Sequence, residues 1–139
     1  MRLTVLTTVL IVACATPLGH VPPVSPMTAA MLVVIRASAE SRDPQLMMLD
    51  GEAIAASPGG RYTQIAIQPG PHRLGIGCVA GWGLTWTEQH QLVLADPRTT
   101  YYFLVTRAPE CGRIESLSAD TARDWLARTA YRPMEGGGQ

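Results

Sequence analysis

Three cysteines carry the most specific chemistry in this chain, and the first of them follows a short apolar run. Met1-Arg2 supplies a positive charge, residues 3–13 are apolar apart from threonines, and Cys14 comes next. A charged start, an apolar middle of about 7–15 residues and small residues at its end are the layout of a secretory signal peptide. The run is shorter than the ~20 residues that a membrane-spanning helix needs. We therefore expect residues 1–13 to be an export signal.

The residues around Cys14 suggest what happens to the chain after export. Ile11-Val12-Ala13-Cys14 resembles the lipobox of bacterial lipoproteins, although Ile11 stands where leucine is commonest. The resemblance implies that the chain is cut before Cys14 and that this cysteine carries palmitate-type acyl chains. Ala15 resembles the pattern of lipoproteins sorted to the outer membrane, so we expect a lipid-anchored envelope protein that faces the periplasm. Two alternatives stay open: an ordinary A-x-A cut after Ala15, which would release a soluble protein, and an uncleaved start.

Cys78 and Cys111 remain once Cys14 is assigned to the lipid. Because exported proteins mature in an oxidising compartment, an even residual count of cysteines favours a disulfide. We expect Cys78 and Cys111 to form it, at one end of the domain. The alternative is a metal site that adds His72 and His90, but the cysteines and histidines lack the close spacing of metal-ligand motifs. We therefore expect no metal.

Other catalytic patterns are missing from the sequence. No G-x-S-x-G occurs, and Gly75-x-Gly77 precedes no expected helix, so neither a hydrolase nor a dinucleotide site is indicated. Asp50 belongs to an expected turn, and His72 is expected to point outward from a strand. We expect no catalytic residues and no cofactor, and thus a non-enzymatic protein, with an unrecognised envelope enzyme as the alternative.

The most suggestive binding feature is a glycine-bearing stretch with Trp82 and Trp86. Two tryptophans in a loop can present an aromatic platform to a sugar ring, a peptide or a protein. The alternative is that Trp86 covers the core and Trp82 covers the disulfide. Envelope proteins or cell-wall glycan are therefore the partners that we expect for this loop.

Composition limits the other partners. The chain has 139 residues and no net charge, and its eleven basic residues are all arginines scattered along the sequence. Without a basic cluster, neither nucleic acid nor an anionic lipid surface is expected as the main partner. The length is enough for one domain with a core of its own.

Short apolar segments separated by turn residues dominate the middle of the chain. Asp50-Gly51 is a strong hairpin signal, and a Pro-Gly turn occurs at Pro69-Gly70. Ser118 is a good N-cap for one helix, whose apolar stripe we expect to run from Ala122 through Trp125 to Ala130. These signals predict an all-β antiparallel sandwich with one short C-terminal helix. The expected strands cover residues 31–38, 46–49, 52–56, 62–67, 72–78, 89–94 and 100–106.

A family resemblance supports this fold. Leu49-Asp50-Gly51-Glu52, Ser57-Pro58 and the segment 69–74 resemble the turns of PEGA-type domains, which have an Ig-like β-sandwich. The Thr100-Tyr101-Tyr102-Phe103 segment before a small helix resembles an uncharacterised family of bacterial lipoproteins. These motifs specify the fold better than the function, and the family has no known catalytic residues to transfer. We expect a binding or structural module, with an accessory subunit of an envelope secretion or export assembly as the alternative. We divide the chain into a signal peptide (1–13), a lipidated, proline-rich tether (14–30), a PEGA-like sandwich (31–132) and a flexible tail (133–139).

Overall fold

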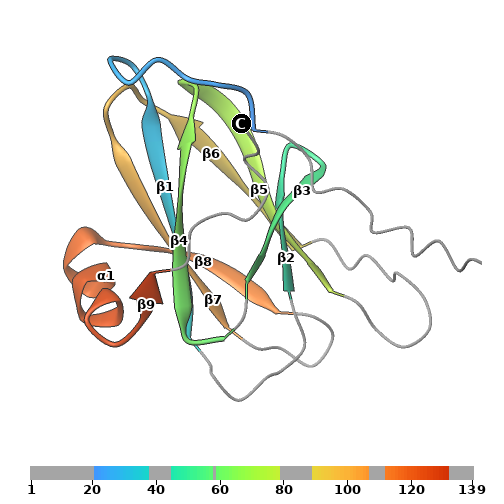
Figure 1. Ribbon diagram of the computed structural model, residues 1–139, viewed down its shortest axis with the longest axis vertical. Coiled ribbons are helices and arrows are strands. Elements are labelled where there is room, and N and C mark those ends of the chain that lie inside the picture. The colour runs from blue at the N-terminus through green and yellow to red at the C-terminus, as the bar shows by residue number, and fades with distance from the viewer. Residues whose placement is uncertain (1–20, 38–44, 58, 79–88, 107–111, 132–139) are drawn as a thin grey trace, which may run out of the picture.

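The computed structural model of the protein describes residues 21–37, 45–57, 59–78, 89–106 and 112–131 (Figure 1). Within these ranges the chain forms nine strands and one helix. The elements are β1 (Ala30–Arg36), β2 (Gln45–Leu49), β3 (Glu52–Ser57), β4 (Arg61–Ile67), β5 (Gly70–Cys78), β6 (Gln89–Ala95), β7 (Thr100–Thr106), β8 (Arg113–Leu117), α1 (Ala119–Leu126) and β9 (Ala130–Tyr131).

The strands form two sheets. The five-stranded sheet has the order β8-β7-β1-β4-β9, and the four-stranded sheet has the order β3-β2-β5-β6. The four-stranded sheet is antiparallel throughout, whereas β1 pairs parallel with β7 and β4 pairs parallel with β9 in the other sheet. The predicted all-β, sandwich-like fold with one C-terminal helix is therefore confirmed, with two parallel pairings added to a mainly antiparallel arrangement.

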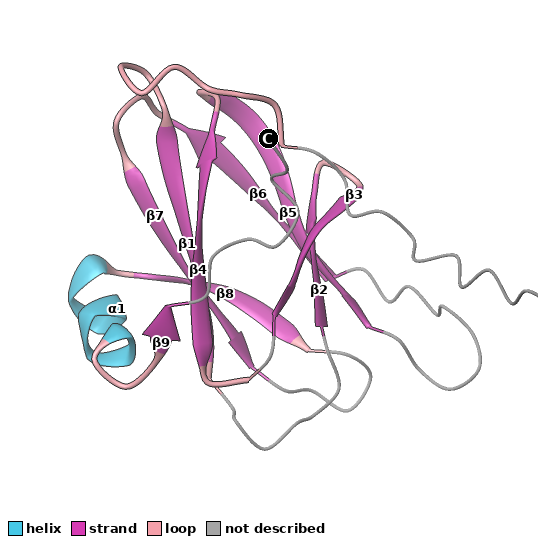
Figure 2. Cartoon of the chain, in the orientation of Figure 1, coloured by secondary structure: helices cyan, strands magenta, loops and turns pink. Residues whose placement is uncertain are grey.

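Strand β1 lies at the centre of the packing because both of its faces are buried. Leu32 and Val34 face the four-stranded sheet and belong to the main core, which includes Ile65, Ile76 and Phe103. The alternate residues of β1 belong to a second cluster, packed against one side of α1: Val33 and Ile35, with Leu104, Ala122, Trp125 and Leu126. Figure 2 shows α1 beside the five-stranded sheet, away from β2 and β3. The protein is thus layered as sheet, sheet and helix.

Local sequence accounts for the hairpin and for the start of the helix. Asp50 and Gly51 have φ angles of 53° and 90°, as a type I′ turn between β2 and β3 requires. Aspartate and glycine tolerate this left-handed backbone better than other residues. The hydroxyl of Ser118 accepts a hydrogen bond from the N–H of Thr121, which satisfies a donor in the first turn of α1. Both predicted signals are confirmed.

Two parts of the prediction need correction. Strands β8 and β9 were not expected, and the stripe assigned to the helix extended too far. Helix α1 ends at Leu126, and Ala130 begins β9 instead, where its N–H donates to the carbonyl of Gly60 at 3.2 Å. Ala130 thus pairs in parallel with Arg61 of β4 instead of extending the helix.

The proline-rich segment before β1 contacts the sandwich. Val21 packs against the main core, and the carbonyl of Ser25 accepts hydrogen bonds from the N–H groups of Thr28 and Ala29. The residues just before β1 thus lie against the domain. In the described part of the chain, no helix is long and apolar enough to cross a membrane.

Candidate functional site

The residues that the sequence singled out fall mostly outside the described ranges. Cys14, Cys111, Trp82 and Trp86 all do so, and Cys78 is described only as the last residue of β5, opposite Gln45. The lipid attachment, the disulfide and the aromatic loop therefore stay predictions. Two other features, at opposite faces of the four-stranded sheet, are fully described.

The first feature is built around His72, and here the expectation of an outward side chain was wrong. In a strand, alternate residues share a face. His72 shares its face with Leu74 and Ile76, which are 0% and 1% exposed in the core. Its side chain is accordingly only 16% exposed, at the end of the sandwich where β5 begins.

Both ring nitrogens of His72 are engaged by acceptors. Nδ1 lies 2.7 Å from Oδ2 of Asp50, and Nε2 lies 2.8 Å from the carbonyl oxygen of Gln68. A carbonyl and an ionised carboxylate can only accept, so both nitrogens donate when the ring is an imidazolium. The ring thus ties the β2–β3 turn to the β4–β5 connection, and both of its nitrogens have partners within the protein.

Asp50 is held in its ionised form by this arrangement. Partial burial disfavours the charge, but the backbone N–H of Arg73, at 2.8 Å from Oδ1, and the hydrogen bond with His72 outweigh it. The positive charges of His72 and Arg73 act in the same direction. The pKa of the Asp50 carboxyl is consequently lowered.

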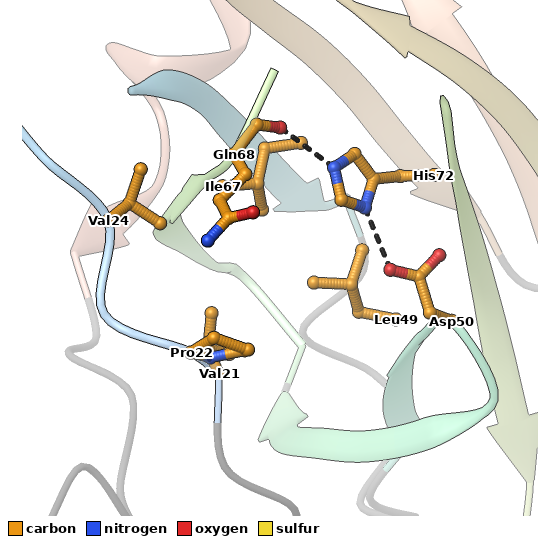
Figure 3. A pocket seen from close by; sticks show the side chains of 8 residues that line it. All are labelled: Val21, Pro22, Val24, Leu49, Asp50, Ile67, Gln68 and His72. Atoms are coloured by element: carbon orange, nitrogen blue, oxygen red, sulfur yellow. Dashed lines mark hydrogen bonds and ion pairs between the residues drawn. The ribbon is translucent and has the colours of Figure 1, made fainter. Parts of the chain in front are cut away.

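A small pocket of about 90 Å³ adjoins this pair (Figure 3). In Figure 3 the segment before β1 lies across the pocket from His72 and Asp50. Most of the lining is apolar, with polar groups at one side: Val21, Pro22, Val24, Leu49 and Ile67, with Asp50, Gln68 and His72. The space is large enough for a mainly apolar group of a few non-hydrogen atoms, somewhat smaller than a benzene ring. Among the described residues no group of three or more histidine, cysteine or acidic side chains could hold a metal.

The second feature is the outer face of β6. Leu92 and Leu94 alternate with buried Val93 and Ala95, and their exposed fractions are 78% and 72%. In the described part of the chain, β6 pairs only with β5 and forms one edge of its sheet. Its sequence, QHQLVLA, contains no aspartate, glutamate, lysine or arginine. An exposed apolar edge strand is typical of an interaction surface.

Sequence reasoning missed both features. The contact of His72 with Asp50 spans 22 residues, although the alternation that places Leu74 inward also places His72 inward. For β6, the absence of charge from a seven-residue strand was a usable signal. No protein-family model, curated protein or solved structure matches this chain.

Proposed function

We propose that the protein is a lipid-anchored module of the bacterial envelope that binds a partner or supports an assembly without catalysing a reaction. The anchoring part rests on the sequence of residues 2–14, with its positive charge, apolar run and lipobox-like ending at Cys14. A PEGA-like β-sandwich in the periplasm, attached to the outer membrane, is part of this proposal.

The observation that carries the binding part is the exposure of Leu92 and Leu94 on an uncharged edge strand. Two large apolar side chains next to each other on one face are costly to leave in water unless a partner covers them for part of the time. By contrast, both nitrogens of His72 are already used within the protein. The described residues therefore favour a binding role over acid–base chemistry.

Anchoring is tested by replacing Cys14 with alanine in the full chain and comparing membrane and soluble fractions. We expect the wild-type protein in the membrane fraction, with an acylated cysteine as its first residue by mass spectrometry. The Cys14→Ala chain should carry no lipid. A wild-type chain that begins at Thr16 without lipid would overturn the anchoring proposal in favour of ordinary cleavage.

Binding is tested in cells with a photo-crosslinking residue at position 92. We expect crosslinked products that are missing when the same residue replaces Arg123, whose side chain is 77% exposed on α1. Equal labelling from both positions, or none from position 92, would contradict a binding surface on β6.

A further inference from the structure

The edge of β6 differs from the other sheet edges in the described part of the chain. Strand β8 carries Arg113 and Glu115, and β9 has only two residues. Strand β3 begins with Glu52, and its pairing with β2 is interrupted by a register shift. Charges, short length and irregular pairing are the means by which natural edge strands avoid pairing with other chains. Strand β6 has seven residues, a regular register with β5 and no aspartate, glutamate, lysine or arginine.

The backbone of β6 also offers hydrogen-bonding groups toward this edge. Arg73 of β5 accepts a hydrogen bond from the N–H of Asp50 through its carbonyl, so this carbonyl points toward β2 and away from β6. Leu92 pairs with Arg73, and in such an antiparallel pair the backbone groups of both residues point away from each other. The N–H and C=O groups of Leu92, and by alternation those of His90 and Leu94, therefore point outward from the sheet.

Tyr101 limits how far an added strand can extend. Its hydroxyl donates to the carbonyl of Leu94 and accepts from the N–H of Asp96, both at 3.0 Å. These bonds already use the carbonyl of Leu94 and the N–H of Asp96, so at Leu94 the edge offers an added strand the backbone N–H alone. The stretch that can take a new strand is centred on Leu92, with His90 and Leu94 on either side.

We propose that β6 pairs with β6 of a second copy of this chain, antiparallel and with a two-fold axis at Leu92. Leu92 would then lie opposite Leu92 of the second copy, and His90 opposite Leu94 at both ends. The two four-stranded sheets would join into one continuous sheet. A segment that pairs with this edge must be an extended, uncharged strand with apolar side chains on one face. Strand β6 itself has these properties.

Charge favours a second copy as the occupant. A two-fold axis brings identical side chains together, so any ionised residue near the centre of β6 would face its own like charge. The central residues of β6 are instead Gln91, Leu92 and Val93. The full sequence has no net charge, and removal of residues 1–13 with Arg2 would leave ten arginines against eleven acidic residues, so copies repel one another only weakly at long range. The inference rests on the proposed function in one respect, because a lipid anchor would confine the copies to a surface and raise their effective concentration.

The test uses cysteine crosslinking of the full chain in its membranes. Residues opposite each other in such a pair have Cα atoms about 5.5 Å apart, within reach of a disulfide. Leu92→Cys should therefore form a homodimer under mild oxidation, identified by a linked peptide that contains position 92 twice. Leu94→Cys alone should crosslink at least tenfold less, because it faces His90, whereas His90→Cys combined with Leu94→Cys should crosslink again.

A second measurement does not depend on crosslinking chemistry. In mild detergent, sedimentation of the wild-type chain should give twice the monomer mass, and Leu92→Lys should give the monomer, because two ammonium groups would meet at the axis. A monomeric wild type without a Leu92 crosslink would overturn the inference. So would crosslinks from position 92 only to other proteins, but this result would leave the binding proposal intact. Loss of membrane attachment with an intact dimer would contradict only the anchoring proposal.

Discussion

The imidazole of His72 lies between the Asp50 carboxylate and the Gln68 carbonyl, with the contact between Nδ1 and Oδ2 measuring 2.7 Å. This contact joins the turn between β2 and β3 to the start of β5, and the two residues are 22 positions apart in the sequence. Asp50 also accepts from the backbone N–H of Arg73, so one carboxylate holds both the side chain and the backbone at the start of β5. Asp50 therefore shapes the β2–β3 turn and also holds that turn against the start of β5.

A double-mutant cycle should measure the energy of this link. Asp50→Asn keeps the size of the side chain and tolerates the positive φ angle, while it removes the charge. Because Asp50 is half exposed, we expect each of Asp50→Asn and His72→Ala to lower the free energy of unfolding by about 1 kcal/mol. Chemical denaturation of the two single variants and the double variant should give a coupling of about 0.5–1 kcal/mol. Strictly additive effects would show that the two side chains do not stabilise the fold through each other.

The same pair predicts a pH dependence with a definite sign. The pKa of Asp50 is lowered in the folded protein, so its ionised form stabilises the fold above the ordinary pKa range of a carboxyl group. This contribution is lost as the pH falls through the folded pKa. We expect the difference in unfolding free energy between wild type and Asp50→Asn to shrink as the pH falls below about 4. A difference that grows on acidification would contradict the assignment.

The strands that the sequence predicted share strong apolar content between turn residues, as in β1 and β7. The missed strands lack this signal. In β8, Ile114 and Leu117 do not alternate, and its neighbours are polar. Strand β9 has two residues, and its place depends on a parallel contact with β4 that no local pattern encodes.

The candidate site was less predictable than the fold for a similar reason. His72 and Asp50 are close only because β5 lies next to β2, which is a consequence of sheet order. In β6 the run Leu92-Val93-Leu94 is apolar on both faces, so local sequence cannot say that one face is covered and the other open. Only the register with β5, which places Val93 opposite His72 on the covered face, shows that the two leucines face outward.

Gly112 provides a test of the packing near the end of β7. A Cβ atom at this position would lie 2.7 Å from Nε2 of Gln45 and 3.1 Å from the carbonyl oxygen of Thr106. Both distances are shorter than ordinary van der Waals contact, and Gln45 is buried. We expect Gly112→Ala to lower the free energy of unfolding by about 1–3 kcal/mol, as overpacking does. Combining it with Gln45→Ala should cost less than the sum of the two single changes, because only the backbone contact remains. An unchanged melting temperature for Gly112→Ala would contradict this packing.

Trp125 should contribute more to stability than its cationic neighbour. It is half-buried against the second core cluster between α1 and the five-stranded sheet, and the guanidinium carbon of Arg128 lies 4.4 Å from its ring centroid. We expect Trp125→Ala to lower the free energy of unfolding by roughly 2–3 kcal/mol, somewhat below the loss for a fully buried tryptophan. Arg128→Ala should cost about 0.5–1 kcal/mol, because an exposed cation–π contact is weak. Thermal melts with Arg123→Ala as a surface control decide this. Equal losses for Trp125→Ala and Arg128→Ala would show that the helix is not held by the tryptophan.

The remaining cysteine pair gives a prediction that also bears on the compartment. If the protein is exported, Cys78 and Cys111 should be joined, and non-reducing digestion should yield a peptide that links them. The closed loop spans about 33 residues, for which chain entropy alone predicts a stabilisation of roughly 3–4 kcal/mol. Reduction, or replacement of both cysteines by alanine, should therefore lower the melting temperature, whereas reductant should not affect the double variant. Full alkylation of both thiols in the native protein without reductant would show that the disulfide is absent. The even count of cysteines would then no longer be an argument for export to an oxidising compartment.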